Sequence, residues 1–172
     1  MVKSVETIET LDLDTLARES WAELGRRYDA GTVPETLRPL DGPLVGRMLA
    51  VRWTRPLAPA LRWLAASRRF VWAGKTWRAA TDQSGAGINR VYVPALLGRQ
   101  DLFPFATGFG PSRLDGRPTV FLDYDLPANP WWIRHIHDEV REVAPGLFLG
   151  PAMWKHGAGA AAVLWFALDT RG

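Results

Sequence analysis

The densest run of polar chemistry in the chain lies at residues 129–142, where the sequence reads Asn-Pro-Trp-Trp-Ile-Arg-His-Ile-His-Asp-Glu-Val-Arg-Glu. Four of its side chains occupy alternate positions: His135, His137, Glu139 and Arg141. Alternate residues of an extended strand project from one face of the sheet. The spacing therefore predicts a cluster of imidazole, carboxylate and guanidinium groups on one face.

Acid–base chemistry needs a titratable group with a partner inside a partly dry pocket. Asp123 and Asp125 share one face of a strand, and paired carboxylates can serve as acid and base. Two alternatives stay open: Asp125 bonds the turn that follows it, and Glu139 forms a surface ion pair with Arg141. The residues that we predict as catalytic are Asp123, His137, Glu139 and Arg141.

Metal binding is a further alternative for the same segment. His135, His137 and His156 are all the histidines of the chain, and imidazoles with a carboxylate suit zinc or iron. The competing interpretation places these histidines at the rim of a barrel, and whether they converge on a metal stays open. We expect no metal and no cofactor.

Aromatic residues are the strongest indication of a binding site. The chain has nine tryptophans, and an aromatic-walled cavity with a few polar groups is the usual form of a small-molecule site. Trp131 and Trp132 are neighbours and cannot both point inward, so we expect one of them to cover a barrel mouth. Lys75 is either an inward amine or a side chain that extends outward. The predicted ligand-binding residues are Trp72, Lys75, Trp77, Tyr92, Phe105, Tyr124, Trp131, Trp132 and Trp154.

The elements that must position these residues are mostly strands. Apolar residues recur at intervals of three and four residues over residues 13–28, which predicts an amphipathic helix. Residues 58–69 are expected to form a short helix. Alternating or aromatic runs bounded by turn residues predict the strands. These runs are residues 44–53, 70–80, 88–93, 102–109, 119–125, 138–143, 147–154 and 160–169.

One hairpin is specific enough to predict its register. Ala144-Pro145-Gly146-Leu147 has Pro-Gly at the central positions, which favours a type II turn. Closing that turn pairs Val143 with Phe148, Arg141 with Gly150, Glu139 with Ala152 and His137 with Trp154. The opposite face of this hairpin then carries Asp138 among mostly apolar residues.

About eight short strands and two helices predict a mainly β protein, an antiparallel up-and-down barrel at residues 37–172 that follows an N-terminal helical segment at residues 1–36. In strand count, size and N-terminal helix the chain resembles the calycin or lipocalin-like group, which implies a barrel that holds a small apolar molecule. Two local motifs, Phe70-Val71-Trp72-Ala73-Gly74-Lys75 and Tyr124-Asp125-Leu126-Pro127, are similar to an uncharacterised bacterial family named for Gly-x-Trp-x-Gly.

The composition of the chain argues against several classes of function. Lysine and arginine number 21 against 18 acidic residues, and the excess lies in residues 31–100 without a clustered basic motif, so we expect no nucleic-acid partner. The chain has no cysteine, which excludes disulfides and a thiol nucleophile. It shows no apolar signal-peptide core and no run long enough for a membrane span, so we expect a cytoplasmic protein without a membrane partner.

These observations favour one function and leave a second open. We expect the barrel to bind a small, largely apolar or aromatic molecule in an aromatic-lined cavity. The alternative is a cofactor-free isomerase, lyase or cyclase that acts on such a molecule in the same cavity by acid–base chemistry. The expected partner is that small molecule, and a homodimer is left open.

Overall fold

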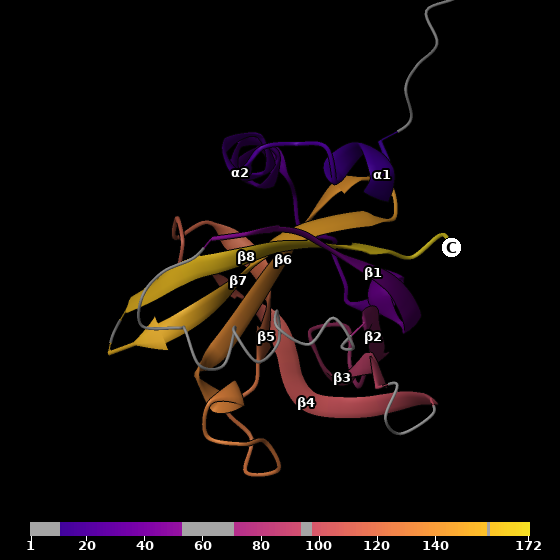
Figure 1. Cartoon of the computed structure of the whole chain (residues 1–172), viewed down its shortest axis with the longest axis vertical. Coiled ribbons are helices and arrows are strands. Elements are labelled where there is room, and N and C mark those ends of the chain that lie inside the picture. The colour runs from indigo at the N-terminus through magenta and orange to yellow at the C-terminus, as the bar shows by residue number, and fades with distance from the viewer. Residues whose placement is uncertain (1–10, 53–70, 94–97, 158) are drawn as a thin grey trace, which may run out of the picture.

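The computed structural model describes residues 11–52, 71–93, 98–157 and 159–172. Two short helices come first, α1 (Leu13–Leu16) and α2 (Trp21–Ala30), followed by a 3-10 turn at Arg38–Leu40. The strands are β1 (Gly42–Val51), β2 (Val71–Ala79), β3 (Ser84–Val93), β4 (Gly98–Pro111), β5 (Pro118–Asp123), β6 (Ile136–Ala144), β7 (Leu147–His156) and β8 (Gly159–Asp169). Figure 1 shows the strands wrapped around a common interior with the helices outside.

The eight strands form a closed antiparallel barrel in chain order. Each strand pairs with the next, and β8 returns to β1, where Gly46 pairs with Leu168 and Val45 with Asp169. Closure gives each of the eight strands a hydrogen-bonded neighbour on both sides, which limits edge-to-edge aggregation. The predicted eight-stranded antiparallel barrel is therefore confirmed.

The helical structure predicted at residues 13–28 is confirmed, but it forms two helices, α1 and α2, instead of one. Ser20 accepts a hydrogen bond from the Glu23 amide at 3.3 Å, and the Glu23 carboxylate accepts one from the Ser20 amide at 2.7 Å. This reciprocal capping box starts a new helix at Trp21. The short helix expected at residues 58–69 lies outside the described residues.

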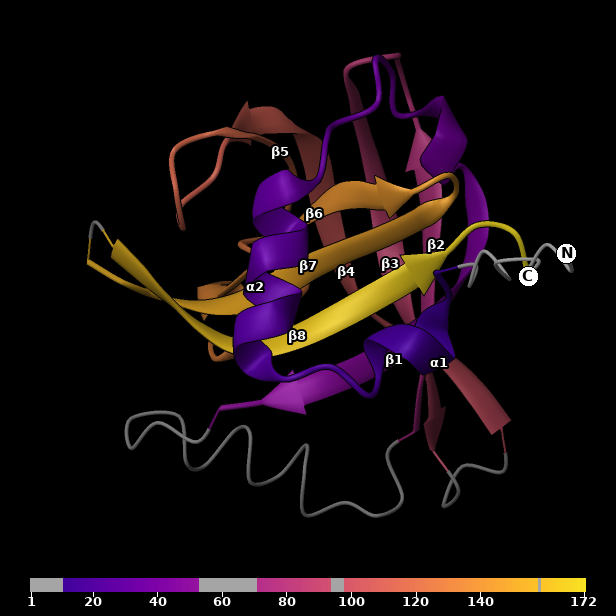
Figure 2. The ribbon, with the colours of Figure 1, turned by 90° about the horizontal axis from the view of Figure 1, so that it is seen from above.

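Two apolar cores lie on opposite sides of the sheet. One fills the barrel, with Trp77, Phe105, Phe148 and Phe166 among its buried members. The other lies between the helices and the outer face of β7 and β8. It contains Leu16, Leu24, Tyr28, Leu147, Leu149, Trp165 and Ala167. Figure 2 shows α2 crossing over β6, β7 and β8, so one face of these strands lines the barrel and the other supports the helix.

The register predicted for the β6–β7 hairpin is wrong by one residue. Ala144 pairs with Leu147 as the turn requires, but the pairing shifts between Glu142 and Ala144. A bulge places one extra residue on one strand, and here that residue is Val143. The observed pairs are therefore Glu142 with Phe148, Arg141 with Leu149, Asp138 with Ala152, His137 with Met153 and Ile136 with Trp154.

The described part of the chain contains no helix long and apolar enough to cross a membrane.

The close approach of β2 to β1 depends on Gly74, which pairs with Val45. Its φ is +116°, a value that residues with a side chain rarely adopt, and the pairing of β2 with β3 shifts beside it. A Cβ added there would lie 2.0 Å from the carbonyl oxygen of Leu44. Only glycine therefore lets β2 pass this close to β1.

We expect Gly74→Ala to lower the free energy of unfolding by about 1–3 kcal/mol, the usual cost of a strained backbone position. Gly98→Ala is the matched control, because a Cβ on Gly98 meets no atom of the described residues within 4 Å and its φ is not positive. Urea denaturation of the two variants measures both effects. Equal losses of stability in both variants would contradict this interpretation of β2.

Candidate functional site

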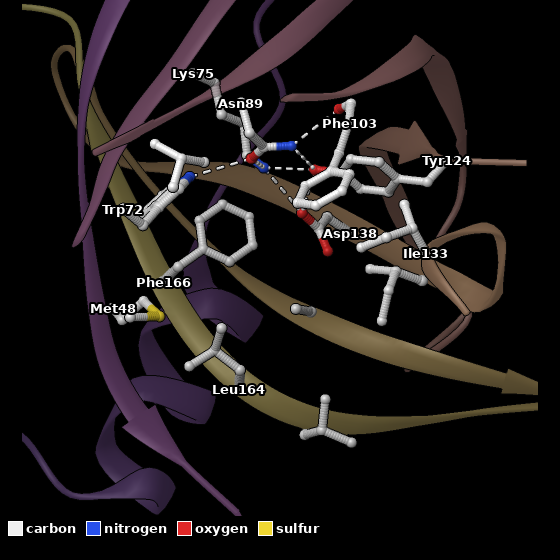
Figure 3. A pocket seen from close by; sticks show the side chains of 14 residues that line it. Met48, Trp72, Lys75, Asn89, Phe103, Tyr124, Ile133, Asp138, Leu164 and Phe166 are labelled. Carbon is white, nitrogen blue, oxygen red and sulfur yellow. Dashed lines mark hydrogen bonds and ion pairs between the residues drawn. The ribbon is translucent and has the colours of Figure 1, made fainter. Parts of the chain in front are cut away.

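A cavity of about 120 Å³ lies inside the barrel (Figure 3). Most of its lining is apolar, and Lys75, Asn89, Tyr124 and Asp138 gather on one side of it. The apolar lining residues are Met48, Trp72, Val91, Phe103, Ile133, Ile136, Ala152, Val163, Leu164 and Phe166. Met48 is 47% exposed, so the cavity approaches the surface beside β1.

The four polar residues come from strands on opposite sides of the barrel. Lys75 on β2 and Asn89 on β3 are direct cross-strand partners. Asp138 on β6 lies opposite Leu122 of β5, and Tyr124 follows the end of β5. Because β2 and β6 are not neighbours in the sheet, the side chains of Lys75 and Asp138 meet across the interior.

Hydrogen bonds join these side chains into one cluster. The Lys75 ammonium donates to Asn89 Oδ1 at 2.8 Å, to Tyr124 Oη at 2.6 Å and to Asp138 Oδ2 at 3.1 Å. The Tyr124 hydroxyl donates to the same Asp138 oxygen at 2.9 Å. Asn89 Nδ2 donates to the carbonyl of Phe103, and Trp72 Nε1 donates to Asn89 Oδ1. All four polar residues are at least nine-tenths buried.

Burial and charge shift the pKa values of Lys75 and Tyr124. Burial lowers the pKa of Lys75, and the Asp138 carboxylate opposes that shift. Burial, with the nearby Asp138 charge, raises the pKa of Tyr124 well above its usual range, so this hydroxyl keeps its proton. Aromatic rings also surround the Lys75 ammonium, with the centroids of Trp72, Phe105, Tyr124 and Phe166 at 5.2–5.3 Å. Ring faces attract a cation, so they help to hold it in an otherwise apolar interior.

Three of the residues predicted as catalytic lie on β6 but outside the cavity. Glu139 accepts a hydrogen bond from the Tyr28 hydroxyl of α2 at 2.8 Å, and its other oxygen lies 3.3 Å from His137 Nε2. Burial raises the pKa of Glu139, but hydrogen bonds, above all the one from His137, outweigh it and lower the pKa overall. This network attaches α2 to the outer face of the barrel.

Arg141 extends the same outer network. Its guanidinium binds both carboxylate oxygens of Asp115, at 2.7 and 2.8 Å, and lies 4.2 Å from the ring centroid of Tyr28. Arg141 is only 1% exposed and also donates to the carbonyl of Pro118. The structure thus brings His137, Glu139 and Arg141 together under α2, and their catalytic role stays a prediction.

Asp123 is the cross-strand partner of His137 on β6, so it lies beside the outer network, and it lines a polar surface hollow. It forms an ion pair with Lys155 at 2.8 Å, and Asp125 forms one with Arg134 at 2.6 Å. Trp131 lines the same hollow. The acid–base role predicted for Asp123 stays a prediction.

The three histidines do not share one site. His135 lies in a 3-10 turn (Ile133–His135) and stacks on Trp154, whereas His137 stacks on Phe121. His156 is exposed. Across the described residues, no three or more His, Asp or Glu side chains are grouped so that they could hold a metal ion.

The structure places the predicted ligand-binding residues in three settings. Trp72, Lys75 and Tyr124 line the cavity. Trp77 and Phe105 are buried in the adjoining core, where their rings pack edge to face.

The remaining four predicted binding residues lie elsewhere. Tyr92 is 44% exposed and Trp131 is 70% exposed. Trp132 packs against Phe103, which itself lines the cavity, and Trp154 stacks on His135.

Sequence reasoning missed Asn89 and Asp138 as site residues. The signal for Asp138 was present, because it is a single aspartate on the strand face that also carries Val140. The signal for Asn89 needed the β2–β3 register, which pairs it with Lys75. Neither residue belongs to a motif, so only their inward position in the barrel reveals them.

The structure is a closed eight-stranded antiparallel barrel with buried aromatic clusters, an architecture compatible with a calycin-like fold. Comparison of the chain with family models, curated proteins and solved structures finds no match. The resemblance to the Gly-x-Trp-x-Gly family therefore stays a prediction.

The Asp115–Arg141 pair has a consequence for acid stability. Hydrogen bonds from Arg141 lower the pKa of Asp115 from 3.8 to about 2. A carboxyl whose pKa is lowered by folding stabilises the protein above its unfolded pKa, and this contribution is lost as pH falls through the folded value. We expect Asp115→Asn to be less stable than wild type at neutral pH, with the difference shrinking between about pH 4 and pH 2. Urea unfolding across that range measures the difference, and a difference that stays constant with pH would contradict the assignment.

Proposed function

We propose that this protein binds one small, largely apolar or aromatic molecule in the barrel cavity. The observation that carries the proposal is the cavity itself, with a mostly apolar wall and one buried polar cluster. Small-molecule sites are typically concave and apolar, with a few polar groups that fix the orientation of the ligand. The Lys75, Asn89, Tyr124 and Asp138 cluster fits that description.

The size of the cavity supports a small ligand. A dry apolar cavity of about 150 Å³ engineered in another protein binds benzene. A cavity of about 120 Å³ with an approach at Met48 suits a molecule of similar size, a single ring with a small substituent. Long-chain ligands would require the barrel to open further.

The proposal is tested by a substitution that fills the cavity with a larger side chain. Ala152 lines it from β7, and we expect Ala152→Leu to weaken binding of phenol and toluene at least about tenfold, which is about 1.4 kcal/mol. Ala22→Leu is the matched control, because Ala22 is exposed on α2. Calorimetric titration measures both affinities. Unchanged binding in Ala152→Leu, or no binding of either probe to wild type, would contradict the proposal.

Acid–base catalysis in the same cavity is the second candidate. It is favoured by Lys75, Tyr124 and Asp138, which are titratable, buried and in mutual hydrogen-bond contact. Buried titratable groups with shifted pKa values are typical of sites that move protons. Turnover of a bound molecule that is lost in Tyr124→Phe while affinity is retained would support this candidate.

A further inference from the structure

Within the described residues, one buried oxygen of the polar cluster has no hydrogen-bond partner. An ammonium has three N–H donors, and those of Lys75 are matched by three acceptors. The hydroxyl of Tyr124 donates to Asp138 Oδ2 and accepts from Lys75 and Asn89. The amide of Asn89 donates to Tyr124 and Phe103 and accepts from Lys75 and Trp72.

Asp138 differs from the other three residues. Its Oδ2 accepts from Lys75 and Tyr124, whereas its Oδ1 is buried and has no hydrogen-bond partner in the described part of the protein. The residue is only 4% exposed and lines the cavity. Figure 3 shows its carboxylate beside Lys75, with the second oxygen turned toward the cavity. Leaving a buried acceptor unsatisfied is costly, so this atom favours a ligand that donates to it.

The charges around Asp138 restrict the ligand further. The Lys75 ammonium already balances the carboxylate at 3.1 Å. A ligand carboxylate would place a second negative charge against Asp138 in a poorly solvated site, and a ligand cation would meet Lys75. Of the donors that remain, a neutral hydroxyl is the smallest that leaves this balance undisturbed.

We propose that the cavity selects neutral monocyclic alcohols or phenols, whose hydroxyl group donates a hydrogen bond to Asp138 Oδ1 while the ring packs among the apolar lining. This inference rests on the proposed function and names the ligand class. Val91, Ile136, Val163 and Leu164 supply the apolar contacts for the ring. These apolar side chains cannot form an ion pair or a hydrogen bond with a charged group on the ligand.

Phenol and toluene test the hydroxyl directly, because they differ only in an O–H that replaces a methyl group. We expect wild type to bind phenol more tightly than toluene by about tenfold or more, the usual gain from a hydrogen bond to a charged group. Benzoate, which carries a carboxylate instead, should bind more weakly than either. Calorimetric titration of all three probes at one pH measures the order.

Two variants locate the preference. Asp138→Asn should reduce the preference for phenol, and Asp101→Asn, which removes an exposed carboxylate from β4, should keep it. If Asp138→Asn does not fold, the double variant Lys75→Met with Asp138→Leu replaces the ion pair by apolar groups, a change that proteins often tolerate. In that variant toluene should bind at least as tightly as phenol.

The outcomes separate this inference from the proposed function. Toluene binding as tightly as phenol to wild type, benzoate binding more tightly than phenol, or a preference that survives the double variant each overturns the hydroxyl assignment alone. Failure of both phenol and toluene to bind wild type overturns the cavity as a binding site and the ligand class with it.

Discussion

Lys75 and Asp138 meet inside the barrel from strands that are not neighbours in the sheet, and closure of the sheet brings them together. Taking a charge out of water costs on the order of several kcal/mol unless an opposite charge and hydrogen bonds compensate. Tyr124 and Asn89 supply those hydrogen bonds, and the surrounding rings add a favourable field. The cluster is therefore stable only in the closed barrel, and the space beside it becomes a polar-ended cavity.

The two faces of β6 carry different polar groups: one face lines the cavity and the other packs against α2. Asp138 faces the cavity, while His137, Glu139 and Arg141 face outward and hold α2 through Tyr28. Neighbouring residues on a strand point to opposite sides, so one short segment supplies both the site and the support for the helix. The charged groups on the outer face of β6 hold α2 against the barrel, whereas the charged groups in the cavity are Lys75 and Asp138.

The strands could be predicted from the sequence because alternation and turn residues mark them, and the Pro145-Gly146 turn is where it was expected. The bulge at Val143 could not be predicted from the sequence, because it depends on how β6 fits its neighbouring strands. An amphipathic helix at α2 was evident, but its pattern does not say which outer face it covers. Residue types favoured His137, Glu139 and Arg141 on the outer face of β6, whereas the residue of β6 that adds a charge to the cavity wall is Asp138.

A crystal structure of the protein grown with saturating phenol would show whether the phenol hydroxyl binds Asp138 Oδ1. We expect the ring in the cavity and its oxygen about 2.5–3.0 Å from Asp138 Oδ1, the ordinary range for an O–H donor. A cavity that holds only water beside Asp138, or phenol bound instead in the surface hollow at Trp131, would contradict the assignment of the cavity as a site for a hydroxyl ligand.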